Sequence, residues 1–288
     1  MTPTPGLDIL FMYAHPDDES FGNGGTLAWA RAAGHKVGLV CATRGEAGEI
    51  SDPSLGPSSM LGATRERELR TAMDLAGVQA IRLLGYRDSG MAGTPENDDP
   101  RSLVQADHDE LMAHVVFQLR DLRPRIVVTF GPDGGYGHPD HIRIGAAVTE
   151  GVEIAASEQF PWLGQPWRVD SLYWASICRE DIQKVAAHGH PYFSRLTSDE
   201  LNSIGTPREE ITHVFDLRPY AADKVRIMLA HPTQLPFQPA PGSPFDPATR
   251  PNIGKESFRK IPLLWTSDED EPDVFDRNHT ANDDFVGL

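Results

Sequence analysis

Two short segments of the sequence gather imidazole and carboxylate side chains, the groups that bind metals and move protons in hydrolases. The first is Ala14-His15-Pro16-Asp17-Asp18-Glu19, and the second is Gly134-Gly135-Tyr136-Gly137-His138-Pro139-Asp140-His141. Zinc and related metals favour these ligand types. The two segments therefore suggest a shared metal centre, if the fold brings them together.

The ligands of such a centre can be assigned from their spacing. A catalytic zinc site takes about three protein ligands and keeps one position open for water. His15 and Asp18 lie three residues apart in a tight turn, so both can face one point, and His141 can supply the third ligand. Asp17 is then free to act as general base on a water whose pKa the metal lowers toward about 7. Iron(II) also suits these ligands.

The remaining polar residues of the second segment have candidate roles in the same chemistry. His138 and Tyr136 are candidates to stabilise an oxyanion or to protonate a leaving amine, and Asp140 could orient a neighbouring imidazole. Either segment alone has a simpler interpretation, because a histidine after a strand is usually a packing or surface residue, and Asp17 or Asp18 could cap the next helix. The metal hypothesis depends on the two segments meeting.

Alternating strand and helix signals predict that they do meet. Nearly continuous apolar runs predict strands at residues 7–14, 36–43, 79–84, 125–130, 169–176 and 212–217. Helical spacing and capping signals predict helices at residues 24–33, 61–76, 107–122, 142–157 and 220–229. This pattern is typical of a Rossmann-like, doubly wound α/β fold, with a mostly parallel sheet and helices on both faces.

The order of strands in such a fold places the two segments at one point. In the common order 3-2-1-4-5, strands one and four are neighbours, and ligands bind outside their carboxyl ends. The first segment follows strand one and the second follows strand four. We therefore expect one metal site at the carboxyl ends of strands 1 and 4.

Length and composition limit the class of protein. The chain has 288 residues, and 26 Lys and Arg stand against 42 Asp and Glu, giving a formal charge of −16. So acidic a chain disfavours nucleic acid as a partner. No stretch approaches the ~20 apolar residues of a membrane span, and the first residues do not resemble a signal peptide. We expect a cytoplasmic protein in which Cys41 and Cys178 are buried free thiols.

The chain is expected to form a single catalytic domain over residues 1–266, followed by an acidic, poorly ordered tail over residues 267–288. Within the domain, residues 7–150 hold the core motifs and residues 151–266 supply the substrate rim. Two long loops rich in Gly, Pro, Asn and Asp, at residues 85–105 and 235–253, are candidates for that rim.

The two segments also resemble the defining motifs of the LmbE-like, or PIG-L, family of zinc-dependent N-deacetylases. The resemblance is strong over roughly residues 7–150 and includes the stretches 43–49, 65–69 and 85–91; residues 230–234 and 256–258 also look familial. The sequence looks similar to the branch that deacetylates N-acetylglucosaminyl-inositol in mycothiol synthesis. Related members act on N-acetylglucosaminyl-malate in bacillithiol synthesis, or cleave the amide of thiol conjugates.

The resemblance implies an LmbE-like fold and a role for each matching residue. It implies His15, Asp18 and His141 as metal ligands and Asp17 as general base. It implies charge stabilisation and acid catalysis by His138 and an oxyanion contact from Tyr136. It also implies that three residues hold the sugar and its aglycone, namely Arg65, Asp88 and Met91. The implied partner is a small-molecule amino-sugar conjugate, and related proteins often form homo-oligomers.

Other classes of protein fit the sequence less well. Residues 22–25, Gly-Asn-Gly-Gly, lie too late after the first strand for a dinucleotide fingerprint and do not form G-x-G-x-x-G. A serine hydrolase would need a G-x-S-x-G elbow, which the sequence lacks. Two alternatives stay open: an amidase acting on a thiol conjugate, and a non-catalytic, metal-containing sugar-binding protein.

Overall fold

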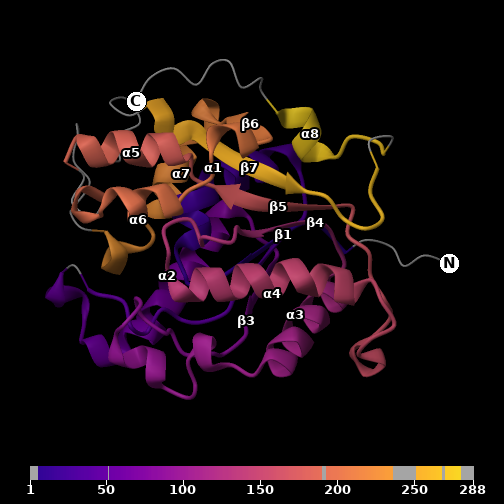
Figure 1. Cartoon of the computed structure of the whole chain (residues 1–288), viewed down its shortest axis with the longest axis horizontal. Helices are drawn as coiled ribbons and strands as arrows, with labels where there is room; N and C mark the ends of the chain where they lie inside the picture. Colours follow the sequence, from indigo (N-terminus) through magenta and orange to yellow (C-terminus); the bar gives the residue numbers. More distant parts are fainter. Residues whose placement is uncertain (1–5, 51, 190–192, 236–250, 268–269, 280–288) are drawn as a thin grey trace.

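The computed structural model describes residues 6–50, 52–189, 193–235, 251–267 and 270–279, which form an α/β fold around one sheet (Figure 1). The described strands are β1 (Leu7–Tyr13), β2 (Val37–Cys41), β3 (Ala80–Leu83), β4 (Pro124–Phe130), β5 (Ser171–Ser176), β6 (His213–Asp216) and β7 (Lys255–Ile261). They form a seven-stranded sheet in the order β3-β2-β1-β4-β5-β7-β6. The predicted order of the first five strands is confirmed, with all of their pairings parallel.

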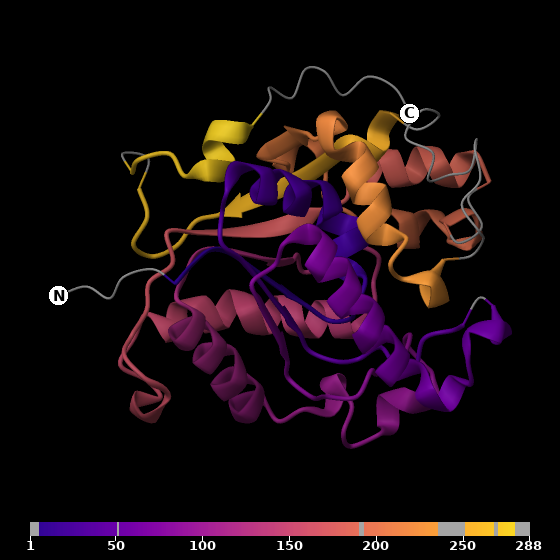
Figure 2. The same cartoon turned by 180° about the vertical axis from the view of Figure 1, so that it is seen from behind.

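Helices cover both faces of this sheet. The described helices are α1 (Asp18–Ala33), α2 (Leu61–Ala76), α3 (His108–Leu122), α4 (Pro139–Ala155), α5 (Arg179–Ala187), α6 (Ser198–Ser203), α7 (Ala221–Met228) and α8 (Val274–Asn278). Helices α3 and α4 lie on one face (Figure 1), and α1, α2 and α7 lie on the other (Figure 2). The doubly wound class predicted from the sequence is confirmed.

The continuously apolar sequence of β1 is explained by the burial of both faces of this strand. Ile9, Phe11 and Tyr13 point into the core beneath α1 and α2, whereas Leu10 and Met12 point into the core beneath α3 and α4. All five side chains are buried. A strand covered on both faces has no polar side, so alternation is lost.

Strand β7 was not predicted, because its sequence has no apolar run. It pairs antiparallel with both β5 and β6, so the sheet is mixed rather than wholly parallel. Along β7, Glu256 and Phe258 are buried while Lys255 and Ser257 are partly exposed. The strand thus buries a carboxylate at a position where the apolar pattern calls for a hydrophobic residue.

Helix α1 begins earlier than its sequence suggests. It starts at Asp18 rather than at residue 24, and Asn23 inside it has non-helical dihedral angles, φ −130° and ψ 20°. Two glycines after Asn23 and one before it weaken the helical signal, because glycine is a poor helix former. The carboxyl end of β1 is therefore joined to α1 by a very short turn.

Within the acidic end of the chain, residues 274–278 form a helix that packs on the core, which differs from the expectation of a poorly ordered tail for these residues. Helix α8 carries Phe275, which is fully buried. Its ring centroid lies 4.8 Å from that of Tyr173, 4.9 Å from Phe215 and 5.1 Å from Phe258. Helix α8 therefore completes the core beside β5, β6 and β7.

Other expectations about the chain can be compared with the structure. Cys41 and Cys178 are buried free cysteines, as predicted. Residues 85–105 form an ordered loop with two short 3-10 turns, whereas most of the predicted loop at residues 235–253 lies outside the described residues. Among the described helices, none has the length and apolar character needed to cross a bilayer.

The packing of Phe275 gives a test of the role of α8. Replacing Phe275 with Ala should lower the free energy of unfolding by about 3–5 kcal/mol, because a fully buried aromatic side chain is removed. Urea unfolding followed by circular dichroism measures the change. Phe117→Ala is the matched control, since Phe117 on α3 is 44% exposed and its loss should change stability little. Equal effects of the two substitutions would show that α8 does not pack as described.

Candidate functional site

The two predicted segments meet at the carboxyl ends of β1 and β4. His15 Nδ1 lies 3.2 Å from His141 Nε2. Asp18 reaches both rings, with Oδ1 3.2 Å from His141 Nε2 and Oδ2 3.7 Å from His15 Nδ1. The three side chains predicted as metal ligands therefore direct their nitrogen and oxygen atoms to one point.

Hydrogen bonds on the far side of each ring fix which nitrogen carries the proton. His141 Nδ1 lies 3.0 Å from the Gly134 carbonyl, which can only accept, so this nitrogen donates. His15 Nε2 lies 3.1 Å from Asp140 Oδ2 and 3.3 Å from Asp88 Oδ1, so it donates as well. In the neutral rings, the nitrogens that face each other both carry lone pairs.

Such an arrangement suits a bound cation. Two imidazole lone pairs and the Asp18 carboxylate repel one another at these distances, and a positive charge between them turns the repulsion into attraction. Outer partners that orient ligating imidazoles are a regular feature of metal sites, and carboxylates and carbonyls are the usual ones. The residues present therefore fit a zinc or iron(II) ion.

The electrostatics of the site favour positive charge as well. Burial by itself would lower the pKa of His15, but hydrogen bonds to Asp140 and Asp88 raise that pKa well above its usual value. Burial would raise the pKa of Asp18, but His141 and His15 hold it well below its usual range. A protonated imidazole and a cation are thus stabilised by the same surrounding carboxylates.

Other side chains also come close enough to be considered as ligands. Ligand atoms of His15, His138 and His141 lie within 4.8 Å of one another, as do those of His15, Asp88 and Asp140. The two carboxylates already accept backbone N–H bonds, with Ser89 donating to Asp140 at 2.9 Å and Gly90 donating to Asp88 at 2.9 Å. Asp18 likewise accepts one backbone N–H, from His15 at 2.8 Å, but its two oxygens face the two imidazole nitrogens directly.

His138 has the hydrogen bonding of a donor rather than of a ligand. Its Nδ1 accepts the backbone N–H of Asp140 at 3.1 Å, at the start of α4, so the proton of the neutral ring sits on Nε2. Burial and the neighbouring imidazoles lower the pKa of His138 to about 4, which favours this neutral ring. An Nε2–H beside the ligand pair is suited to bind a developing oxyanion.

Asp140 connects these groups. The residue is fully buried, and its Oδ2 accepts from both His15 and Ser89, while its backbone N–H donates to His138. Its other oxygen, Oδ1, has no hydrogen-bond partner among the described residues. These contacts are suited to orienting His15, and the role of Asp140 stays a prediction.

Asp17 lies beside the ligands in an unusual backbone conformation. Its φ of 106° is in the region that favours glycine, and such strain costs about 1–3 kcal/mol. Arg65 binds its carboxylate, with Nη2 3.2 Å from Oδ1, and also donates to the Pro16 carbonyl at 2.7 Å. Burial, only partly offset by Arg65, raises the pKa of Asp17 to about 6. The turn therefore directs a carboxylate of raised basicity beside the ligand cluster.

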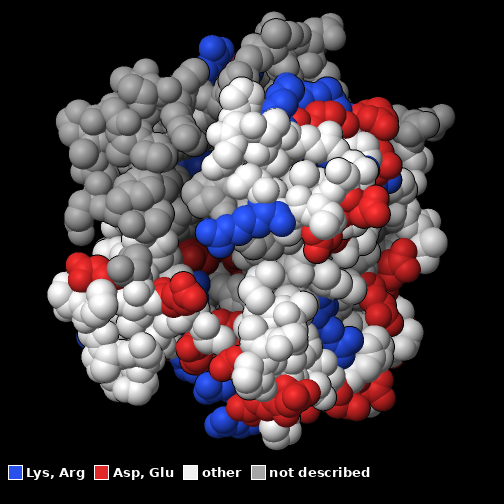
Figure 3. All heavy atoms as spheres, turned by 60° about the vertical axis from the view of Figure 1, so that its left-hand side comes forward, with Lys and Arg blue, Asp and Glu red and all other residues white. Residues whose placement is uncertain are grey.

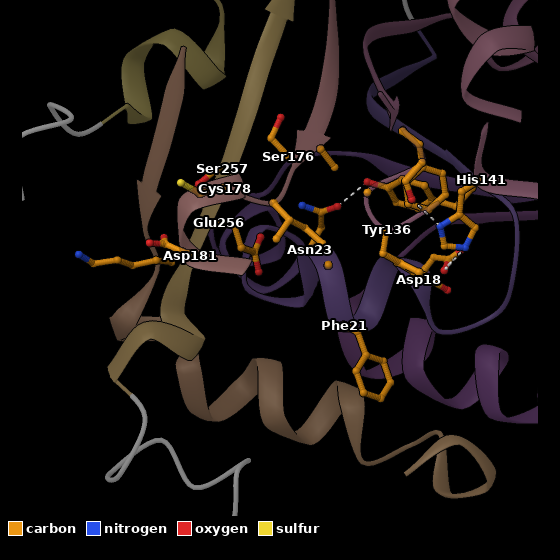
Figure 4. Close-up of a pocket in the computed structure, with 18 of the residues that line it drawn as sticks. Asp18, Phe21, Asn23, Tyr136, His141, Ser176, Cys178, Asp181, Glu256 and Ser257 are labelled. Atoms are coloured by element: carbon orange, nitrogen blue, oxygen red, sulfur yellow. Dashed lines mark hydrogen bonds and ion pairs between the residues drawn. The ribbon is translucent and has the colours of Figure 1, made fainter. Parts of the chain in front are cut away.

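A cavity of about 520 Å³ opens over these groups. The molecular surface is hollowed on this side, and both acidic and basic side chains surround the hollow (Figure 3). Asp18, His141 and Tyr136 lie at one end, and Asp181, Glu256 and Ser257 lie at the other (Figure 4). The Tyr136 ring stands edge-on to His141 with centroids 5.0 Å apart. The cavity is large enough for a small sugar conjugate.

The three predicted substrate-binding residues do not line this cavity. Arg65 is buried and binds Asp17 and two backbone carbonyls. Asp88 is buried behind His15, and Met91 is 37% exposed. Their contacts place Arg65 and Asp88 in support of the metal-site turn, and their predicted role in holding the sugar stays a prediction.

Sequence reasoning missed the polar residues at the far end of the cavity. Glu256 accepts hydrogen bonds from the Gly25 and Thr26 amides at 2.8 and 3.0 Å and from Lys224 at 2.8 Å. Tyr13 donates to Asn23 at the bend of α1. In the sequence, the signal for this end of the cavity is an acidic residue, Glu256, within the short stretch 256–258 that resembles the family.

The fold and the site together define an α/β protein with an imidazole and carboxylate cluster at the switch point of its sheet. Residues 10–152 match the family model described as "PIG-L: GlcNAc-PI de-N-acetylase". A 1D-myo-inositol 2-acetamido-2-deoxy-alpha-D-glucopyranoside deacetylase from Geodermatophilus obscurus is 42% identical over 248 residues, covering 81% of this chain and 84% of that protein. The chain belongs to the PIG-L family of de-N-acetylases, and the resemblance found in its motifs is confirmed.

Two further proteins extend the comparison. An enzyme of the same name from Rhodococcus jostii is 41% identical over 246 residues, covering 81% of this chain and 83% of that protein. The solved structure of the N,N'-diacetylchitobiose deacetylase from Pyrococcus horikoshii has a TM-score of 0.62 at 21% identity, covering 88% of this chain and 84% of that one. The structural match supports the fold.

The position of Arg65 gives a test of the Asp17 turn. A Cβ on Gly45 would lie 2.0 Å from Arg65 Nη1, and Gly45 has φ +67°. Gly45→Ala should therefore lose about 1–2 kcal/mol through backbone strain and a further ~1–3 kcal/mol through the clash. Gly85→Ala is the control, because Gly85 has φ +92° but open space around its Cβ position. Urea unfolding that gives equal losses would mean that Arg65 does not occupy this position.

Proposed function

We propose that the protein is a zinc-dependent hydrolase that removes the N-acetyl group from a small molecule containing N-acetylglucosamine. The observation that carries the proposal is the convergence of two imidazole lone pairs and a carboxylate on one point, with a second carboxylate, Asp17, beside them under a cavity. Membership of the de-N-acetylase family supports the same reaction.

The metal in this proposal is held by His15 Nδ1, Asp18 and His141 Nε2. Zinc suits the set, and iron(II) suits it too. When bound, such an ion polarises an amide carbonyl and lowers the pKa of water. Asp140 holds His15 in the tautomer that leaves Nδ1 free, and the Gly134 carbonyl does the same for His141 Nε2.

Asp17 is the general base. It lines the cavity next to Asp18, where a water attacking an acetamide carbon would pass. In the proposed reaction Asp17 takes one proton from this water as the C–O bond forms. The same proton moves to the amide nitrogen as the C–N bond breaks. Acetic acid and a free amine form, which at neutral pH become acetate and an ammonium group, so the reaction consumes one water and no other co-reactant.

Two side chains serve the oxyanion. The Nε2–H of His138 is available as a neutral donor, because its Nδ1 is occupied by the Asp140 N–H. Tyr136 lies in the cavity wall against His141 (Figure 4). A donor aimed at developing negative charge contributes about 10²–10³ in turnover in known acyl-transfer enzymes.

The substrate is proposed from the relatives. Proteins about two-fifths identical to this chain are named for the deacetylation of a glucosaminyl-inositol. The acetamide would sit at the Asp18 and His141 end, and the aglycone would point toward Asp181 and Ser257, whose groups can bind hydroxyls. The cytoplasmic location and assembly into a homo-oligomer stay predictions.

The proposed reaction is tested directly by amine release. The purified protein should contain about one zinc or iron per chain and should release primary amine, detected with fluorescamine, from N-acetylglucosaminyl-inositol. Chelation should abolish the release and zinc should restore it. Amine release from N-acetylglucosaminyl-malate alone would identify malate, rather than inositol, as the aglycone. Metal without amine from any acetamide would favour a thiol-conjugate amidase or a binding protein, and failure to bind any metal would refute the proposed centre.

The general base is tested by Asp17→Asn. Turnover should fall by about 10² or more, because the amide cannot take the proton from water. Zinc content should stay unchanged, since Asp17 is not among the proposed ligands. Asp121→Asn on α3 is the control, as Asp121 is 47% exposed and distant from the cavity lining. Near-full turnover in the Asp17→Asn enzyme would remove Asp17 from this role.

A further inference from the structure

A chain of buried polar groups connects the second half of the molecule to Asp17. His231, Ser20 and Glu19 are all fully buried. His231 Nε2 lies 2.9 Å from Ser20 Oγ, and Ser20 Oγ lies 2.5 Å from Glu19 Oε1. The other oxygen of Glu19, Oε2, accepts the backbone N–H of Asp17 at 3.2 Å. The proposed mechanism uses none of His231, Ser20 and Glu19.

The direction of each hydrogen bond in this chain is fixed by its chemistry. The Ser20 hydroxyl has one proton, which goes to the Glu19 carboxylate, so its oxygen must accept from His231 Nε2–H. His231 Nε2 also lies 3.5 Å from Glu19 Oε1. His231 Nδ1 has no partner among the described residues. The polar contacts of this imidazole are therefore directed entirely at Ser20 and Glu19.

The chain ends on the strained residue of the site. A non-glycine residue at φ 106° persists only where its surroundings over-determine it. Arg65 holds Asp17 by its carboxylate, and Glu19 holds it by its N–H. A buried carboxylate such as Glu19 needs its donors, and an unsatisfied one would turn to other partners. Ser20 and His231 supply those donors on the side away from Asp17.

The segment that carries His231 is itself fixed to the neighbouring helix. Thr233 donates to Glu68 on α2 through its N–H at 3.0 Å and through its hydroxyl at 2.6 Å. Glu68 lies one helical turn after Arg65. The turn at residues 231–233 thus contacts both helices that hold the Asp17 turn, and its imidazole cannot shift freely.

We propose that His231 is a positioning residue: through Ser20 and Glu19 it holds the backbone of Asp17 in the left-handed conformation that directs its carboxylate at the ligand cluster. The effect on turnover rests on the proposed deacetylase function, whereas the effect on the backbone does not. His231 contacts neither the cavity nor the proposed ligands.

The kinetic test compares two substitutions of the imidazole. His231→Leu removes the donor and should lower kcat by about 10- to 100-fold through misplacement of the base. KM and zinc content should not change. His231→Gln keeps an N–H close to the position of Nε2 and should recover most of the loss. Ser20→Ala breaks the same connection without touching His231 and should reproduce the kcat loss, which keeps the test open if His231→Leu folds poorly.

A matched control separates positioning from general destabilisation. His213 on β6 is also buried and lies outside the cavity lining, and its Nε2 lies 2.9 Å from Asp276 Oδ1 on α8. His213→Leu should lower thermal stability but leave kcat unchanged at temperatures well below unfolding. An equal kcat loss in His213→Leu and His231→Leu would overturn the positioning role.

The structural test needs no substrate. Crystal structures should show the φ of Asp17 leaving the left-handed region in His231→Leu and keeping it in His231→Gln. The proposal is overturned if Asp17 keeps its φ in both His231→Leu and Ser20→Ala. A wild-type enzyme inactive on every acetamide would refute the deacetylase proposal, while the φ of Asp17 would still decide the role of His231.

Discussion

The site depends on two imidazole nitrogens that face each other at 3.2 Å with their lone pairs inward. With both rings neutral this arrangement is repulsive, and hydrogen bonds made behind each ring hold it in place. The acceptor behind His141 is the backbone carbonyl of Gly134, in the loop after β4, and the acceptor behind His15 is the carboxylate of Asp140, at the start of α4. Because β1 and β4 pair in parallel, with Ile9 opposite Ile126, the rings cannot separate without disrupting the centre of the sheet. The core thus supplies the energy that keeps a cation-binding point in place.

The carboxylates near this point differ because their contacts differ. Asp18 faces the two rings, whereas Asp17, one residue earlier, is turned away from the helix by its positive φ and is held by Arg65. Asp140 accepts a backbone amide and orients His15. The pKa of Asp18 is held low by the imidazoles, and that of Asp17 is raised by burial. Adjacent residues of one type can therefore serve as ligand and as base.

The sequence was sufficient to predict the parallel half of the sheet and the meeting of the two segments, because buried parallel strands have strong apolar runs and the switch point follows from strand order. It was not sufficient for β7, whose buried Glu256 breaks the apolar pattern, nor for α1, whose bend at Asn23 hides its first turn. The burial of Phe275 was missed because acidic neighbours dominate its segment. Arg65 and Asp88 were placed by motif alone, and motif does not show whether a side chain faces a cavity or the protein.

The missed features share one physical cause. Glu19, Glu68 and Glu256 are buried acids whose partners are, respectively, His231 by way of Ser20, Thr233 and Lys224. Local periodicity reports burial of apolar surface, and it carries no information on which distant group satisfies a buried charge. These pairings join α1 and α2 at the catalytic edge to the chain after α6. The later third of the molecule therefore supplies polar partners to α1 and α2, the helices that carry Asp18 and Arg65 and flank Asp17.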